Sequence, residues 1–191
     1  MLPPRPFFFL RHGQTDWNAQ GRIQGHTDVP LNATGVAQAQ AAAGRLQGRG
    51  IDWIVSSPLA RARSTAEFVA RRLGLPVQLD DDLKERRFGA FEGMIADEVK
   101  RAHGLAPEQP ISLILPPDAE QWPQTLARSR AVVGKWLAAQ PDKVVLFVSH
   151  DGLFRALHEQ LLGSRPGATH AAPYRFAPRE ERWSVTELAS A

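Results

Sequence analysis

The chain has 191 residues, 43% of them hydrophobic, and this length predicts one globular domain, 1–191, with a substantial core. Its formal net charge is +3, and its arginines are scattered rather than gathered in one basic run, which argues against nucleic acid as a partner. Because the sequence contains no cysteine, it excludes disulfide frameworks, thiolate zinc sites and cysteine nucleophiles.

Apolar runs and helical patterns alternate along the chain. The strand candidates are 6–10, 52–56, 76–79, 144–149 and 183–188, and the helix candidates between them are 34–47, 59–73, 121–138 and 153–162. Several of the strands are continuous apolar runs, which is typical of a sheet covered on both faces. The pattern predicts a three-layer α/β/α sandwich with a mostly parallel central sheet and right-handed crossovers.

The segment at about 88–120 interrupts this alternation. It contains prolines at 107, 110, 116 and 117 and one clear helical pattern, near 95–102. We expect an insertion that lies over one edge of the sheet and acts as a lid.

The longest apolar stretches, 7–10 and 144–148, are far shorter than the roughly 20 residues that span a bilayer. The apolar run after Arg5 is also too short for a secretory signal. We therefore expect a cytoplasmic protein with no membrane partner, either a monomer or a homodimer.

Polar residues follow three of the predicted strands. Arg11 and His12 end the first strand, Arg61 begins the helix after the second, and His150 ends the late strand. The carboxyl ends of parallel strands meet at one edge of a sheet, where ligands bind. Arginines and histidines at such an edge suit an anion, and glycines such as Gly13 allow the backbone to approach closely.

Four segments carry a resemblance to a known family. They are "LRHGQTDWNAQGRIQGHTDVPLNATG", "SSPLARARSTAE", "LKERRFGAFEG" and "VSHDGLFRAL". In this order they resemble the signature segments of the histidine phosphatase superfamily, which includes the cofactor-dependent phosphoglycerate mutases. The match extends from about residue 8 to residue 160, and four spaced motifs are far more specific than "RHG" alone.

The resemblance implies a catalytic role for five residues. His12 matches the nucleophile that accepts the phosphoryl group, while Arg11, Arg61 and His150 match the phosphate pocket. Glu85 matches the acid that protonates the leaving oxygen. Such chemistry needs a neutral imidazole as nucleophile and a carboxyl with a raised pKa as proton donor.

The resemblance also implies which residues bind phosphate. Asn18, Gln24 and Gly25 fall where family members contact phosphate or substrate. No metal and no cofactor is expected, because the arginines and the second histidine supply the positive charge. The implied function is a metal-independent phosphatase that hydrolyses small phosphomonoesters through a phosphohistidine intermediate.

Several alternatives stay open. A phosphoglycerate mutase would use the same phosphoenzyme, a non-catalytic regulatory module would only bind phosphate, and a third type of enzyme would act on phosphoproteins. A metal site built from His12, His26 and His150 is disfavoured, because these residues lack metal-ligand spacing.

Two features remain undecided. Asp151 stands where relatives often have a small residue, and its carboxylate either faces the pocket or points away from it. The tail at 170–183 offers His170, Tyr174, Arg175 and Trp183 for a pocket wall. The simpler prediction is that Tyr174, Phe176 and Trp183 pack the last strand.

Overall fold

The computed structural model describes residues 2–180 and 182–189. Within these residues, strands form one mixed sheet in the order β3-β2-β4-β1-β5-β6. Their bounds are β1 (Phe7–Arg11), β2 (Trp53–Ser56), β3 (Val77–Leu79), β4 (Val145–Ser149), β5 (Pro173–Arg179) and β6 (Arg182–Glu187). Neighbouring strands from β3 to β1 run parallel, whereas β5 and β6 are each antiparallel to the strand before them in this order.

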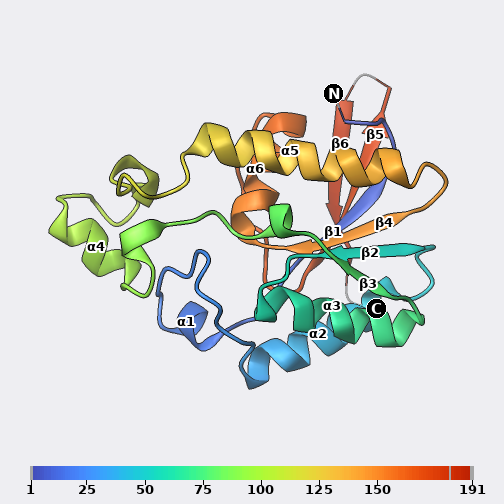
Figure 1. Cartoon of the computed structure of the whole chain (residues 1–191), viewed down its shortest axis with the longest axis horizontal. Helices are drawn as coiled ribbons and strands as arrows, with labels where there is room; N and C mark the ends of the chain where they lie inside the picture. The colour runs from blue at the N-terminus through green and yellow to red at the C-terminus, as the bar shows by residue number, and fades with distance from the viewer. Residues whose placement is uncertain (1, 181, 190–191) are drawn as a thin grey trace.

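Helices cover both faces of the sheet (Figure 1). The α-helices are α1 (Asp16–Ala19), α2 (Ala33–Leu46), α3 (Ala60–Leu73), α4 (Ala96–Ala102), α5 (Trp122–Ala139) and α6 (Asp151–Leu162). Short 3₁₀ turns are η1 (Asp81–Leu83), η2 (Gly89–Phe91) and η3 (Ile111–Leu113). Helices α2 and α3 lie on one face, and α5 and α6 lie on the other, so the predicted α/β/α sandwich is confirmed. No helix within the described ranges is long and apolar enough to cross a membrane.

Strand β1 is buried on both sides because its side chains alternate between two cores. Phe7 and Phe9 pack in the core under α5 and α6, whereas Phe8 and Leu10 pack in the core under α2 and α3. All four are at most 3% exposed. Burial of each is worth roughly 1.5–3 kcal/mol, which fixes the end of β1 firmly within the sheet.

The tail departs from the prediction. Residues 173–179 form β5, which pairs with β1 and with β6, so the tail adds a strand as well as packing against the last one. Pro173, Pro178 and the arginines at 175 and 179 obscure the alternation of apolar residues. Proline is tolerated at the first position of a strand, and the pairing of Phe7 with Phe176 supplies what the local pattern lacks.

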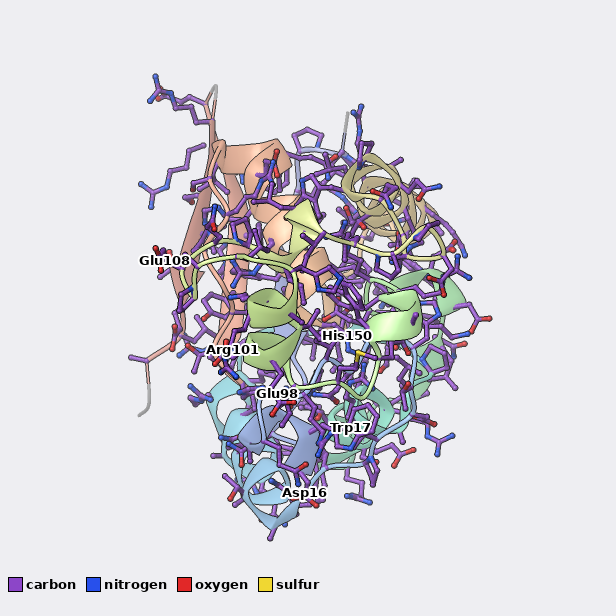
Figure 2. All side chains as sticks on the ribbon, turned by 90° about the vertical axis from the view of Figure 1, so that its left-hand side faces the viewer. Asp16, Trp17, Glu98, Arg101, Glu108 and His150 are labelled. Atoms are coloured by element: carbon purple, nitrogen blue, oxygen red, sulfur yellow. The ribbon has the colours of Figure 1, made fainter. Side chains whose placement is uncertain are left out.

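The segment at about 88–120 holds α4, η2 and η3 around a small core of its own, in which Ile23, Phe91 and Val99 are buried. Backbone hydrogen bonds tie it to the loop after α1: the Ile23 amide donates to Met94 over 2.9 Å and the Gly93 amide donates to Ile23 over 2.8 Å. Figure 2, which looks onto this side of the molecule, shows α4 in front of the sheet edge that carries His150. The lid role stays a prediction.

Replacing Gly13 with alanine is expected to destabilise the fold by about 1–3 kcal/mol, because the added Cβ would lie 2.4 Å from the Gly35 carbonyl oxygen at the start of α2. Gly44→Ala is the matched control, because Gly44 lies in α2 as Gly35 does and a Cβ added there would meet no atom within 4 Å. That control is expected to stabilise the protein by about 0.5–1 kcal/mol. Urea unfolding measures both, and equal midpoints for the two variants would contradict the packing argument.

Candidate active site

The carboxyl ends of β1, β2 and β4 bring together residues from three parts of the sequence. His12 follows β1, and its amide donates to the Ser149 carbonyl over 3.0 Å. His150 follows β4 at the N-terminus of α6, and its ring centroid lies 5.1 Å from that of His12. Arg61 lies in the first turn of α3 and is fully buried. The strand ends therefore converge as predicted.

The imidazole of His12 is fixed in one tautomer. Its Nδ1 lies 2.7 Å from the carbonyl oxygen of Gly13, which can only accept, so Nδ1 carries the proton. The lone pair is then on Nε2. Burial, followed by the positive charges of Arg61 and Arg11, holds the pKa of His12 well below its usual value, so the ring is neutral at physiological pH. A neutral ring with a free Nε2 is the form that can attack phosphorus.

The Arg61 guanidinium is held by backbone carbonyls. Its Nη1 donates to Thr27 over 2.9 Å and its Nη2 donates to Gly25 over 2.8 Å. Burial lowers the pKa of Arg61, but an arginine starts so high that it stays charged. Gly25 adopts a left-handed backbone with φ +54°, and a Cβ there would meet the Glu92 carboxylate. Gly25 thus positions the arginine through its carbonyl.

His150 is paired with a serine that the sequence analysis did not assign to the site. Ser57 Oγ lies 2.8 Å from His150 Nε2, and the Leu59 amide donates to the same hydroxyl. When the Ser57 hydroxyl donates to Nε2, the proton of His150 is on Nδ1, which is buried and has no partner in the described part of the chain. Burial and the charge of Arg61 lower the pKa of His150 well below normal. The sequence does place Ser57 directly after the predicted strand at 52–56, and this position was the available sign that Ser57 belongs to the site.

Arg11 is anchored on the opposite side of His12. Its Nη1 donates to the Ala168 carbonyl over 2.6 Å and lies 3.7 Å from Asp151 Oδ1. The Asp151 carboxylate also accepts from Arg155 Nε over 2.6 Å and from the Ala168 amide over 2.8 Å. The question that the sequence left open is thus answered: Asp151 faces the pocket, where it links Arg11 to α6 and to the loop before β5.

Glu85 lies across from these cations at the N-terminus of α6. Its Oε1 accepts from the Arg86 amide over 2.8 Å and from the Gly152 amide over 3.0 Å. Burial, together with the negative charge of Asp151, raises the pKa of the Glu85 carboxyl. Glu85 lines a cavity of about 450 Å³ between α6 and the 88–120 segment, with Lys100 among its walls. A carboxyl with a raised pKa beside a cavity is suited to donate a proton.

The remaining predicted residues lie on the loop between β1 and α2. Asn18 lies in α1 and completes the capping box of Thr15: its Oδ1 accepts from the Thr15 amide over 3.1 Å, and its side-chain NH₂ is left to donate elsewhere. Gln24 is 8% exposed, and its Oε1 has no hydrogen-bond partner among the described residues. Both amides therefore keep polar groups that a ligand can use.

Glu92 is a second residue that the sequence analysis did not assign. Its carboxylate accepts from the backbone amides of His26, Thr27 and Phe88 over 2.9–3.0 Å, and the Thr27 hydroxyl also donates to it. His26, once weighed as a metal ligand, places Nε2 2.8 Å from the Glu85 carbonyl. Glu92 thereby fastens the loop that holds Arg61 to the segment that carries Glu85.

The buried polar atoms that lack a partner gather at this site. In the ranges that the structure describes, eight such side-chain atoms occur, and five belong to residues around His12. They are Arg11 Nε, Gln24 Oε1, Arg61 Nε, His150 Nδ1 and His170 Nε2. Buried polar groups are nearly always paired. Four of these five atoms are nitrogens that can donate, whereas Gln24 Oε1 is an acceptor, and such a cluster of nitrogens points to an anionic ligand.

The comparison with protein families decides the assignment. The model of the histidine phosphatase superfamily (branch 1) matches residues 7–188. The chain belongs to this superfamily. The resemblance carried by the four segments is therefore confirmed for nearly the whole chain.

Relatives of this histidine phosphatase carry phosphatase names. It is 35% identical to the uncharacterized phosphatase PhoE of Bacillus subtilis, over 93% of this chain and 91% of that protein. It is 37% identical to the glucosyl-3-phosphoglycerate phosphatase of Mycolicibacterium vanbaalenii, over 83% of this chain and 75% of that protein. A solved mycobacterial glucosyl-3-phosphoglycerate phosphatase in complex with VO3 superposes with a TM-score of 0.83 at 32% identity, over 95% and 97% of the two chains.

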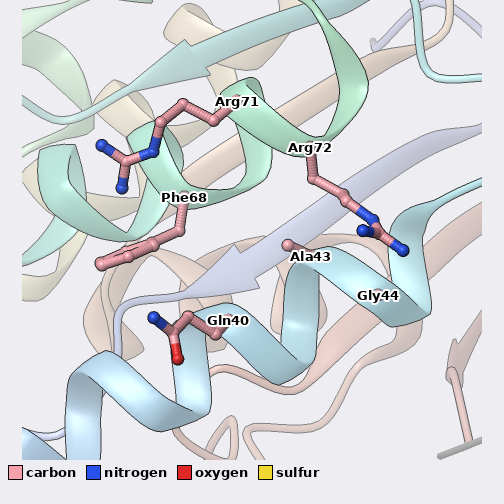
Figure 3. Close-up of a pocket in the computed structure, with 6 residues that line it drawn as sticks. All are labelled: Gln40, Ala43, Gly44, Phe68, Arg71 and Arg72. Carbon is pink, nitrogen blue, oxygen red and sulfur yellow. The ribbon is translucent and has the colours of Figure 1, made fainter.

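A second hollow of this histidine phosphatase lies between α2 and α3 (Figure 3). Its volume is about 500 Å³, and its walls are Gln40, Ala43, Gly44, Phe68, Arg71 and Arg72. The Arg71 guanidinium lies over the Phe68 ring at 4.6 Å. This lining contains no histidine, serine or carboxylate that could act as nucleophile or acid, so this hollow is not a candidate active site.

Proposed function

We propose that this protein is a metal-independent phosphatase that hydrolyses small phosphomonoesters through a phosphohistidine at His12. Its superfamily and the phosphatase names of its relatives support the reaction class. The observation that carries the proposal is the free Nε2 of His12 among donors of Arg11, Arg61 and His150 that have no partner in the described ranges, opposite Glu85.

In the first step, His12 Nε2 attacks phosphorus, and the bond between phosphorus and the ester oxygen breaks. The Glu85 carboxyl gives its proton to the departing oxygen, so the leaving group departs as an alcohol. Arg11, Arg61 and the Nδ1 hydrogen of His150 stabilise the charge that grows on the equatorial phosphoryl oxygens.

In the second step, the Glu85 carboxylate takes a proton from water while the water oxygen attacks the phosphoryl group on His12. The bond between phosphorus and Nε2 breaks, and the histidine returns to its neutral form. Glu85 is again protonated, so one carboxyl serves both half-reactions. Burial supports this double use, because a pKa raised toward the working pH lets the group give and take a proton.

The leaving group would occupy the cavity beside Glu85. Arg86 lines this cavity, is only 5% exposed and donates from Nε to the Glu120 carbonyl. No ion pair of Arg86 occurs in the described part of the chain. Together with Lys100, it gives the cavity cations for hydroxyl or carboxylate oxygens, which favours a small polar organic phosphate.

The test is phosphate release from a panel of phosphomonoesters in the presence of EDTA. The panel contains neutral sugar phosphates, phosphoserine, phosphoglycerates, glucosyl-3-phosphoglycerate because relatives carry that name, and a phosphohistidine peptide. We expect turnover of at least one small ester and higher kcat/KM when its alcohol carries a carboxylate. Isomerisation of 3-phosphoglycerate without phosphate release would instead identify a mutase, and turnover of the peptide alone would contradict the proposed substrate class.

A further inference from the structure

A third histidine lies beside the nucleophile. His170 stands in the loop between α6 and β5, and its ring centroid is 5.8 Å from that of His12, with 58° between the ring planes. The mechanism above gives it no role. In the strand order, β5 lies on one side of β1, while β4 and β2 lie on the other. His170 precedes β5 and Arg61 follows β2, so the two residues come to the site from opposite sides of β1.

One ring nitrogen of His170 is left without a hydrogen bond in the described part of the chain. Its Nε2 is buried and has no hydrogen-bond partner among residues 2–180 and 182–189. Nearby side chains that carry charge are Arg11 and Asp151, and the titratable neighbour is His12, directly after β1. A buried imidazole nitrogen left unpaired costs free energy, unless a ligand completes it.

The backbone around His170 is built to hold the ring in place. The next residue, Ala171, has φ 49°, which alanine rarely adopts. Its amide donates to the Arg11 carbonyl over 3.0 Å, and its own carbonyl accepts from the Arg45 guanidinium. A strained residue that is tied on both sides keeps His170 next to the phosphate-binding Arg11, as strained residues at functional sites often do.

We propose that His170 is a further phosphate-binding residue, whose Nε2–H donates a hydrogen bond to the phosphoryl group held at His12. This inference rests on the proposed function, because it needs a phosphoryl group at that position. It assigns a contact with the phosphoryl group to the loop before β5.

The charges around His170 give the contact a dependence on pH. Burial and the positive charge of Arg11 lower the pKa of His170 to about 4, whereas the charge of Asp151 acts in the opposite direction. A bound phosphoryl dianion adds negative charge and raises the pKa. Phosphate binding is then coupled to proton uptake, so the affinity of the site for phosphate rises as the pH falls through the pKa of the bound state.

The experiment measures the affinity for inorganic phosphate by calorimetry in native protein, His170→Leu, His170→Gln and His158→Leu. Loss of one hydrogen bond to a charged group is expected to weaken phosphate binding about tenfold in His170→Leu. The glutamine keeps a donor and is expected to recover part of the affinity. His158→Leu is the matched control, because this imidazole lies on α6 and its Nδ1 bonds the carbonyl of Ser164, just after that helix.

Imidazole NMR of native protein provides a readout that does not depend on a variant folding. Addition of phosphate is expected to shift the His12 and His170 resonances together and to raise the pKa of His170. If phosphate shifts His12 but leaves the His170 resonance and its pKa unchanged, the inference is overturned while the proposed function stands. If phosphate binds nowhere near His12, the proposed function itself fails.

Discussion

Replacing His12 with alanine is expected to lower phosphate release by about 10⁴-fold or more. The reason is geometric. His12 Nε2 carries the lone pair of a neutral ring, and the His150 ring and the charges of Arg61 and Arg11 lie close to it. Ser57, a second nucleophilic side chain at this edge, has its hydroxyl bonded to His150 and to the Leu59 amide. Without the phosphohistidine, the reaction has no two-step route.

The measurement is p-nitrophenyl phosphate hydrolysis in EDTA, with His158→Ala on α6 as the control for loss of a histidine outside the site. Circular dichroism and the urea midpoint establish that both variants are folded. Native protein quenched during turnover is expected to carry one phosphate on His12, detected as a mass increase that acid removes. Activity retained in His12→Ala but lost in Ser57→Ala would transfer the role of nucleophile to the serine.

Much of this site was readable from the sequence, because it lies at the ends of continuous apolar strands. The run "FFFL" predicts a buried strand, and the structure buries it between two cores so that Arg11 and His12 emerge at the carboxyl edge. The glycine after the histidine was expected to permit close approach of the backbone. In the structure the group that approaches Gly13 closely is the Gly35 carbonyl at the start of α2, and close approach to an anion stays a prediction.

The residues that the sequence did not reveal act through contacts between distant segments. Glu92 accepts from amides 65 and 66 residues away, and His150 meets Ser57 across 93 residues. No local period marks such pairs. The second sheet neighbour of β1, strand β5, was missed for the same reason. Its sequence contains two prolines and no clear alternation, and it is a strand because it pairs with β1 and β6. His170 precedes that strand, so its approach to His12 follows from the missed pairing.

Replacing Glu85 with glutamine is expected to separate the two half-reactions. With an alkyl phosphomonoester, the leaving oxygen needs a proton, so turnover is expected to fall by about 10²–10⁴-fold. With p-nitrophenyl phosphate, the phenolate departs without a proton and His12 is still phosphorylated. The variant should then release one equivalent of p-nitrophenol in a burst and hydrolyse the phosphohistidine slowly, because no carboxylate activates the water.

The pH dependence gives a second signature of Glu85. Because burial raises its pKa, the protonated acid persists above the usual range of a glutamate, and kcat/KM for the alkyl ester is expected to fall as the pH rises through that pKa. In the Glu85→Gln variant, this fall of kcat/KM with rising pH should be absent. The same shift makes the charged carboxylate unfavourable in the folded state, so above the unfolded pKa the variant is expected to be more stable than native protein.

Glu67→Gln on α3 is the matched control, since among the described residues this glutamate pairs only with Arg63 on the helix surface, and its side chain is 48% exposed. This variant should hydrolyse both esters at the native rate, and its kcat/KM should show the native dependence on pH. A Glu85→Gln variant that lost the same factor on both esters, without a burst, would show that Glu85 does not transfer the proton. The proton donor would then have to be another group that lines the cavity, such as Asp151, which pairs with Arg11 and Arg155.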